Sequence, residues 1–321
     1  EFEMMKKTTS ALAVAALLGT GAATAATFQV NEDASISIGG DFQMQYGTAT
    51  DATGTDVTSF TDNGTSLVFS GEHTSDNGLT TFFNLDLDGF DTTENSSAFQ
   101  GGDVDEGSVG VRGSFGEIRV GSDAGVYDNY ADFGDIEWIG DRTSFSNGDV
   151  SDVVQYNNTV GAVDFTLQAQ IGDDTGTEAE ESTSLGFGAS VDLGEVTLSG
   201  AYEDGGNTAD EEAIYGVGAM ANLGGVDLTV GYEADNADAN SIDKIVLNAA
   251  YTIDAVTLTG SMQNVSYDEN PAGEDDDSFT ELNLSVAYSM TDQVTLWAET
   301  VREDRQNDAG DYNAVGLYYA W

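Results

Sequence analysis

The chain has 321 residues, and its 58 Asp and Glu against 8 Lys and Arg give a formal net charge of -50. This charge excludes nucleic acid and anionic lipid surfaces as electrostatic partners. A carboxylate excess of this kind repels itself at low salt and becomes tolerable where the Debye length falls to roughly 3 Å, near 1 M salt. We therefore favour a high-salt habitat, with divalent-cation binding as an alternative that can coexist with it.

The first 25 residues have the features of a signal peptide. A cationic start is followed by an apolar stretch from Ala11 to Leu18, too short to span a bilayer, and by the small-residue cleavage site Ala23-Thr24-Ala25. Residues 1–3 precede any plausible start Met and look like an addition to the natural protein. We expect residues 1–25 to be removed on export and residues 26–321 to fold as one domain.

Beyond this leader, apolar and polar residues alternate with period two. Ile36, Ile38 and Phe42 share one parity, whereas Ser37 and Asp41 share the other. A strand with this pattern is apolar on one face and polar on the other. The pattern recurs in 79–88, 163–171, 185–193, 196–202, 226–232, 245–253, 256–262, 282–290, 294–299 and 315–321.

Two kinds of connection alternate between these segments. Short ones such as Leu193-Gly194-Glu195 are typical of hairpin turns, and long acidic ones such as 48–63 and 268–278 lie between them. Strands of roughly ten residues with alternately short and long connections are the signature of an outer-membrane barrel. Counting the segments gives about 16 strands, a number that leaves an aqueous channel. The predicted fold is an all-β transmembrane antiparallel barrel.

A soluble β-sandwich is the alternative, because it too has one buried and one wet face. A sandwich surface carries mixed charge, whereas Lys and Arg are nearly absent here. Tyr also recurs near the strand ends, as expected for an interfacial girdle. These residues are Tyr46, Tyr202, Tyr232, Tyr251, Tyr267 and Tyr288. Both features favour the barrel.

One long stretch, Gly121 to Asp149, follows neither strand nor helix period. Such an insert in a regular pattern is usually functional or disordered. Its apolar residues, among them Tyr127, Tyr130, Phe133 and Trp138, are too many for a solvated linker. We expect the stretch to fold into the lumen of the barrel and narrow it. These aromatic residues then either wedge it against the wall, which we favour, or form a sugar-stacking surface.

Val109 to Gly121 reads VGVRGSFGEIRVG, and the stretch that follows contains GVYD at 125–128 and DFGD at 132–135. These segments resemble the strands, turn and acidic loop tip at the constriction of general diffusion porins from Gram-negative outer membranes. The C-terminal Trp321 stands where that family usually has Phe. The resemblance implies a 16-stranded homotrimer in the outer membrane, surrounded by lipid and lipopolysaccharide, with its third extracellular loop folded inward.

The chain departs from this family in its basic wall opposite the acidic loop. The family commonly has Arg or Lys at four positions that are uncharged here, namely Ser66, Ser70, Ser122 and Gln155. By strand parity Arg112 and Arg119 point inward with Gln155. We expect the wall to be reduced to Arg112 and Arg119, with Arg142 reaching it from the far end of the loop.

Carboxylates on a loop in a water-filled channel attract cations and repel anions. The stretch holds five, which are Asp123, Asp128, Asp132, Asp135 and Glu137. We expect Asp128, Asp132 and Asp135 to face the lumen and set its field. The alternative is that carboxylates in so acidic a chain have no particular direction. For Arg112 and Arg119 the alternative is a structural ion pair that anchors the loop, and both roles can hold.

No catalytic or metal site is predicted. The chain has no Cys, and His73 is its only His. The acidic runs 178–181, 211–212 and 274–277 lack the spaced Asp, Asn and Gly of a Ca²⁺ loop. We expect no cofactor, although loosely bound Ca²⁺ or Mg²⁺ between the loops stays open.

The sequence therefore predicts a passive outer-membrane channel for ions and small hydrophilic solutes, with a preference for cations and no enzymatic activity. One alternative is a solute-specific channel for sugars or organic ions. The other is an acidic outer-membrane barrel that transports nothing, such as a Ca²⁺-binding adhesin.

Overall fold

The computed structural model describes residues 25–51, 53–88, 103–134, 138, 145, 149–171, 184–204, 213–236, 241–268, 278–305 and 310–321. The predicted leader up to residue 24 lies outside these ranges, as do the acidic runs 178–181, 211–212 and 274–277. Within the described ranges, no helix is long and apolar enough to cross a membrane.

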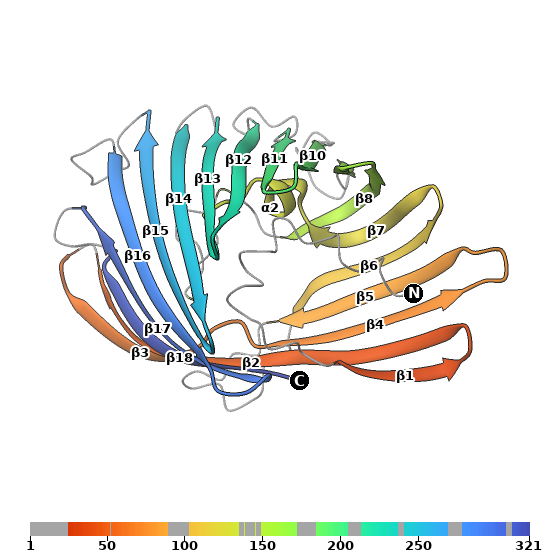
Figure 1. Ribbon diagram of the computed structural model, residues 1–321, viewed down its shortest axis with the longest axis horizontal. Helices are drawn as coiled ribbons and strands as arrows, with labels where there is room; N and C mark the ends of the chain where they lie inside the picture. The colour runs from red at the N-terminus through yellow and green to blue at the C-terminus, as the bar shows by residue number, and fades with distance from the viewer. Residues whose placement is uncertain are drawn as a thin grey trace, which may run out of the picture.

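The described chain is almost entirely β-strand, with one short helix, α2 (Val126–Tyr130). The strands are β1 (Ala26–Asn31), β2 (Ala34–Thr50), β3 (Asp56–Asp62), β4 (Ser66–Thr74), β5 (Thr80–Asp88), β6 (Asp103–Gly113), β7 (Gly116–Ala124), β8 (Asp149–Val160), β9 (Val163–Gln170), β10 (Ser184–Asp192), β11 (Val196–Glu203), β12 (Ile214–Leu223), β13 (Val226–Asp235), β14 (Ile242–Ile253), β15 (Val256–Tyr267), β16 (Ser278–Ser289), β17 (Val294–Glu303) and β18 (Tyr312–Ala320). Figure 1 shows them as one curved wall.

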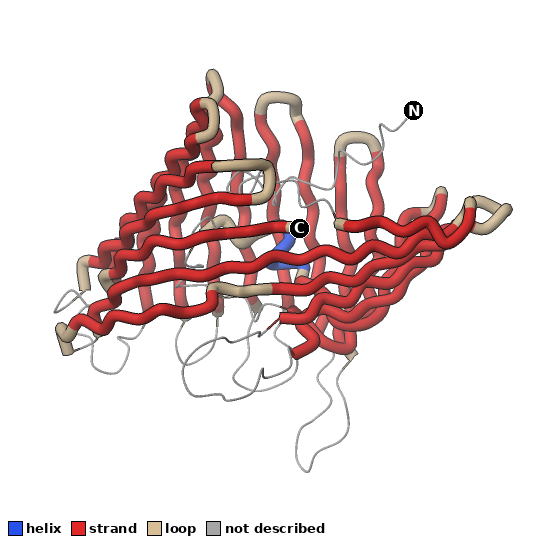
Figure 2. Tube along the Cα trace, turned by 90° about the horizontal axis from the view of Figure 1, so that it is seen from below, coloured by secondary structure: helices blue, strands red, loops and turns tan. Residues whose placement is uncertain are grey.

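The wall closes on itself as an antiparallel barrel. From β4 to β18 each strand pairs with the next along the chain, including β9 with β10, and β18 pairs with β2, which pairs with β4. In this circuit β2 and β4 to β18 are paired on both sides, whereas β1 and β3 pair with β2. Closure is the condition under which strands can span a membrane. Figure 2 shows the strands running side by side, joined by short hairpin turns. The barrel prediction is confirmed, and the β-sandwich is excluded.

The 18 strand segments occupy 16 positions in the barrel. On one side of β2, β18 pairs with residues 41–49 and β1 with residues 34–38, so the two ends of the chain complete one strand position. The backbones of Trp321 and Gly40 exchange hydrogen bonds of 3.1 and 3.3 Å at this junction. On the other side, β3 and β4 share a second position. Two shared positions reduce 18 segments to 16, as the sequence predicts.

The prediction of a long connection over residues 48–63 is wrong. β2 continues to Thr50, and a tight turn leads into β3. The hydrogen bond from the Thr53 hydroxyl lowers the pKa of Asp51, and so do those from the N–H groups of Thr55 and Thr53, at 2.9 and 2.8 Å. The alternation pattern does not predict β3, because its apolar residues Val57 and Phe60 have opposite parity.

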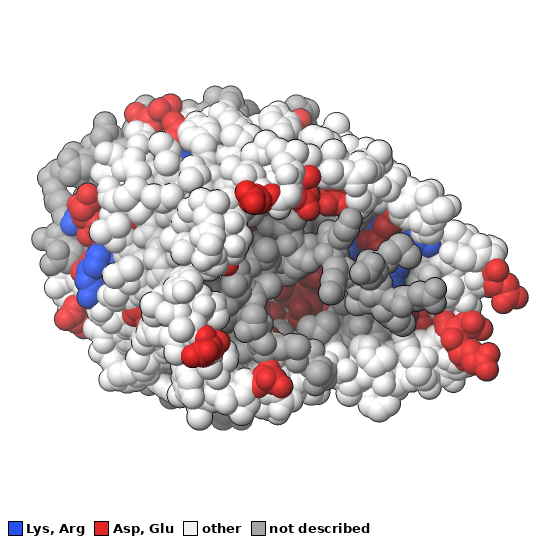
Figure 3. Space-filling view, viewed as in Figure 1, with Lys and Arg blue, Asp and Glu red and all other residues white. Residues whose placement is uncertain are grey.

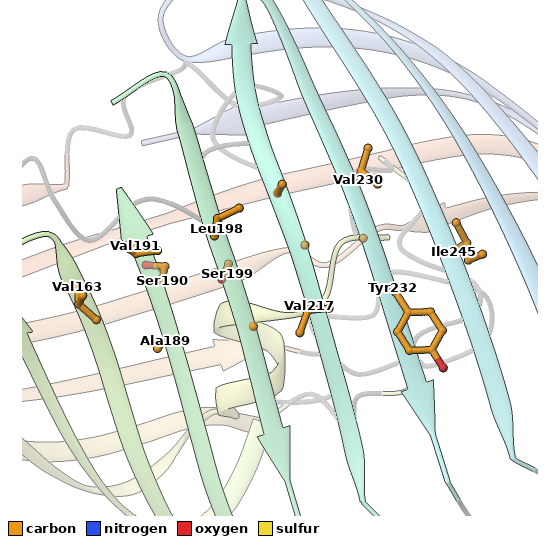
Figure 4. A pocket seen from close by; sticks show the side chains of 14 residues that line it. Val163, Ala189, Ser190, Val191, Leu198, Ser199, Val217, Val230, Tyr232 and Ile245 are labelled. Atoms are coloured by element: carbon orange, nitrogen blue, oxygen red, sulfur yellow. The ribbon is translucent and has the colours of Figure 1, made fainter. Parts of the chain in front are cut away.

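The two faces of the wall differ as the alternation requires. On the outer face Ile36 is 41% and Leu284 64% exposed, the disposition of side chains that meet lipid. A shallow apolar groove of about 920 Å³ crosses this face between β9 and β14 (Figure 4). Its ridges include Val163, Val217 and Ile245, and smaller outward residues lie between them. The inner face carries the polar set.

Candidate functional site

The long insert is shorter than predicted. β7 runs to Ala124 and β8 begins at Asp149, so the long loop comprises residues 125–148. Asp123 was predicted in the loop but lies in β7, where it pairs with Val150 across to β8. The ladder continues past Gly121 because a bulge between Gly121 and Asp123 absorbs the break in alternation.

The structure describes residues 125–134, 138 and 145 of the long loop. The loop begins with α2, whose N–H at Tyr127 donates to the Glu203 carboxylate on β11 at 2.9 Å. A carboxylate is favourable there, because the first N–H groups of a helix have no partner within it. α2 contacts β9, β10, β11 and β12 (Figure 1). Predicted site residue Asp128 lies half-buried in its first turn.

Glycines of the inner face make room for the loop. A Cβ atom built on any of them would lie less than 3.0 Å from Val126, Tyr130, Ala131 or Phe133 of the loop. These glycines, here called the glycine seat, are Gly186, Gly188, Gly216, Gly218 and Gly231. They read as ordinary strand positions in the sequence. Inward glycines clustered on neighbouring strands are the signal that something packs closely against that wall.

Polar side chains of the wall satisfy the backbone of the loop, which would otherwise be buried without partners. Ser199 on β11 donates to the Tyr130 carbonyl at 2.6 Å, and Asn248 on β14 donates to the Phe133 carbonyl at 2.6 Å. Gln263 on β15 donates to the carbonyl of Gly134 at 3.3 Å. The described part of the loop therefore follows the inner face from β11 to β15.

The Tyr130 hydroxyl lies 3.0 Å from the hydroxyl of Thr166 on β9. Burial raises the pKa of Tyr130, and the hydrogen bond to Thr166 offsets part of that rise. The phenol is therefore neutral at ordinary pH and acts as a hydrogen-bonding anchor.

A buried ion pair, which the sequence does not predict, lies between the loop and the wall. Lys244 Nζ on β14 is 2.8 Å from Glu233 Oε2 on β13, and both side chains are 0% exposed. Glu233 also accepts the Tyr127 hydroxyl at 2.5 Å and the Phe133 N–H at 3.0 Å. Predicted site residue Asp132 has a 10% exposed side chain, and its Oδ1 is 4.0 Å from Lys244 Nζ. The structure thus brings Asp132 to Lys244.

A second contact holds the loop farther along the wall. Trp138 stacks on Trp297 of β17 with ring centroids 5.5 Å apart and 10° between the planes. Asn63, between β3 and β4, donates to the Trp138 carbonyl at 2.6 Å. Tyr127 and Phe133 are 1% and 5% exposed, and Trp138 is also buried. Their burial agrees with the wedge interpretation and leaves little ring surface for a sugar.

The two predicted wall arginines sit among carboxylates. Arg112 is 2.5 Å from Glu72 and 4.0 Å from Glu117. Arg119 is 2.9 Å from Glu117 and also pairs with Asp123. The guanidinium carbons of Arg112 and Arg119 lie over the ring of Phe82, 5.1 and 5.7 Å from its centroid. The ion pairs of Arg112 and Arg119 thus join them to carboxylates of the wall strands, and Asp135, Glu137 and Arg142 lie outside the described residues.

All five Lys and Arg of the described ranges have a carboxylate within 4.0 Å. Besides Arg112, Arg119 and Lys244, these are Arg302, 3.4 Å from Asp311, and Arg305, 2.6 Å from Glu303. Figure 3 looks onto the hollow of the barrel, in which acidic side chains are visible. Over the part of the chain that the structure describes, positive charge is therefore compensated locally, and the excess charge is negative.

Comparison with known proteins agrees with this fold. Two relatives are 25% identical to the chain over 374 residues, which covers 98% of this chain and all of theirs: a monosaccharide porin of a Halomonas species and a major outer membrane protein of Halomonas elongata. An anion-selective porin from Comamonas acidovorans superposes with a TM-score of 0.69 at 15% identity, covering 90% of this chain and all of that one.

Two further structures give the same result. A variant of the Rh. blastica porin has a TM-score of 0.72 at 16% identity and covers 89% of this chain and all of its own. The trimer form of OmpT, an outer membrane protein of Vibrio cholerae, has a TM-score of 0.69 at 13% identity, with 90% and 100% coverage. The family model described as Gram-negative porin matches residues 9–309. The chain belongs to the Gram-negative porin family.

Proposed function

We propose that this porin, a diffusion channel of the outer membrane rather than an enzyme, prefers cations and passes small hydrophilic solutes without a cofactor. One observation carries the cation preference. Every basic side chain in the described ranges has a carboxylate within 4.0 Å, in a chain with a net charge of -50. Because the positive charges are offset in this way, the carboxylates that face the lumen are proposed to attract cations and repel anions.

The long loop is proposed to be the constriction. Its described residues contact the glycine seat and the polar side chains of β11 to β15, the face opposite the exposed apolar residues. A segment on that face takes up part of the cross-section available to water. Asp128 and Asp132 on the loop, with Asp135 and Glu137 farther along, are the proposed source of its negative field.

A solute-specific sugar channel is the second candidate, since one relative is named a monosaccharide porin. The burial of Tyr127, Phe133 and Trp138 argues against these rings as a sugar track. A saturable block of ion current by one sugar would favour this candidate. A barrel that raises no bilayer conductance would instead point to a non-transporting protein.

Three further features are proposals. We propose a homotrimer surrounded by lipid and lipopolysaccharide, and one structurally similar protein is described in a trimer form. Residues 1–25 are proposed to be a signal peptide, and the charge of -50 points to a saline habitat.

The test is the reversal potential of the purified channel in a KCl gradient across a planar bilayer. We expect permeability to K⁺ above that to Cl⁻, and a preference for Cl⁻ would reject the proposal. Asp132→Asn removes one loop charge and should weaken the preference while the barrel still assembles. Asp254→Asn is the matched control, because Asp254 lies in an exposed turn with a φ of 54° that Asn tolerates. An equal shift in both variants would mean that Asp132 has no special place in the pore.

A further inference from the structure

Lys244 lies where two parts of the long loop meet the wall. Its Nζ is 2.8 Å from Glu233 on the neighbouring strand and 4.0 Å from Asp132 in the outgoing part of the loop. The same Nζ lies 5.1 Å from the ring centroid of Phe145, which belongs to the returning part. A cation over an aromatic face is attracted by the ring. Lys244 thus contacts residues that are 13 positions apart along the loop, from 132 to 145.

Glu233 complements this arrangement from the next strand. One of its oxygens accepts the Tyr127 hydroxyl at 2.5 Å, and the other accepts the Phe133 N–H at 3.0 Å. Tyr127 lies in α2, whereas Phe133 lies beyond its end. A single carboxylate therefore fixes both ends of residues 127–133 to β13. Lys244, paired with it at 2.8 Å, stabilises the charge that this carboxylate needs for both bonds.

The pair is costly unless it is complete. Taking two charges out of water is unfavourable, and their attraction offsets the cost only when the geometry is good and the remaining hydrogen bonds are made. Removing one partner leaves a buried charge without compensation, whereas replacing both can be nearly neutral. Because both side chains are 0% exposed, the loop has to move if either is to reach water.

We propose that Lys244 and Glu233 are positioning residues that hold the long loop against β13 and β14 and so set the width of the channel. This inference rests on the proposed function in one respect, namely that the loop narrows the lumen. Neither residue needs to touch the permeating ion, since both act through the loop.

The experiment compares Lys244→Met, Glu233→Gln and the double variant with the wild-type porin in planar bilayers. Lys244→Met leaves Glu233 buried without its cation, and we expect a higher single-channel conductance with frequent transitions between levels. The double variant removes both charges but keeps an oxygen acceptor for Phe133 and a partner for Tyr127. We expect its conductance and noise to return toward wild type.

Arg302→Met is the matched control, because it also removes a paired cation. Arg302 is paired with Asp311 beyond β17, and its hydrogen bonds go to Val301, Tyr312 and Asn313, none of them in the long loop. Its conductance should equal that of the wild type. Heat-shifted migration on gels verifies that each barrel is folded, and if Lys244→Met does not fold, Glu233→Gln takes its place.

A second measurement needs no conductance. Limited proteolysis with mass spectrometry should find new cleavage within residues 125–148 in Lys244→Met and less in the double variant. Wild-type conductance and wild-type protection in the single variants would overturn the inference, as would a double variant no closer to wild type than Lys244→Met. A wild-type channel that prefers anions would reject the proposed cation preference and leave this result standing.

Discussion

At the scale of single residues, the charge that a side chain contributes depends on the partners with which it pairs. Arg119 has the position expected of a basic wall, yet it pairs with Glu117 at 2.9 Å and with Asp123. Its charge is therefore offset twice, and the same holds for Arg112 with Glu72 and Glu117. A guanidinium between two carboxylates contributes little net positive potential at a distance. The inner face is acidic because carboxylates outnumber basic groups and because the basic groups are paired with carboxylates.

The change Arg119→Gln tests this account. It removes one positive charge and leaves Glu117 and Asp123 without that counter-charge, so the K⁺ over Cl⁻ permeability ratio should rise. The measurement is the reversal potential in a KCl gradient, at low salt where screening is weak. Arg305→Gln, which removes the charge paired with Glu303 at the far end of β17, should give a smaller shift. A ratio that falls in Arg119→Gln would contradict the assigned field.

Parity predicts the face of a side chain but not its partner. Ile118 and Val120 are exposed on the outer face, so the inward direction of Arg119 follows from the sequence. Its bond to Asp123 does not, because that residue was expected in the loop. The link between Asp132 and Lys244 joins residues 112 positions apart, and no local pattern encodes such a contact. From the sequence, Lys244 can be predicted only to point inward, because its neighbour Ile245 points outward.

At the scale of elements, the long loop is held by the shape of the wall as much as by polar bonds. The glycine seat removes side chains where α2 and Phe133 approach β10 to β13. Phe133 lies against Gly218 and Gly231 at once, closer than any Cβ atom would permit. The groove on the outer face crosses some of the same strands, so this part of the wall is thin on both sides.

Gly231→Ala should displace Phe133, because the new Cβ would fall less than 3.0 Å from three atoms of that residue. Overpacking of this kind costs typically about 1–3 kcal/mol. Thermal unfolding in detergent and single-channel conductance should both change. Gly260→Ala is the control, since its Cβ would meet Leu284 at an ordinary 3.4 Å. If the two variants unfold at the same temperature, Phe133 can move away from the new Cβ atom without cost. The glycine seat then has no role in holding the long loop.

Elements with strict alternation are predictable, and those without it are not. β9, β14, β15 and β16 follow the period because each face meets a different medium over the whole strand. β1 and β3 escape detection, since β1 is short and exposed and β3 has its apolar residues on both faces. α2 has five residues, too few for a helical period to show.

The whole molecule combines a closed wall with a very large negative charge. Closure of 16 strand positions pairs β2 and β4 to β18 on both sides, so the wall holds together against the mutual repulsion of its carboxylates. That repulsion acts between charged side chains and leaves the backbone hydrogen bonds of the strands intact. The sequence predicts the closure, because alternation and connection lengths encode it. The position of the described part of the long loop on the inner face depends on contacts with strands distant in sequence, which alternation does not encode.

Salt should therefore stabilise this porin. Raising NaCl from about 0.1 M to about 1 M shortens the Debye length from roughly 10 Å to roughly 3 Å and weakens the mutual repulsion of the carboxylates. We expect the unfolding temperature in detergent to rise over this range. Sucrose at equal osmolality separates this screening from solvent exclusion, which also favours compact states. Small amounts of Ca²⁺ or Mg²⁺ added at constant ionic strength test whether the loops bind these cations loosely. A bound ion would raise the unfolding temperature by mass action, and EDTA would reverse that rise. An unfolding temperature that is flat or falling in NaCl would mean that the charge of -50 imposes no repulsion on the folded barrel.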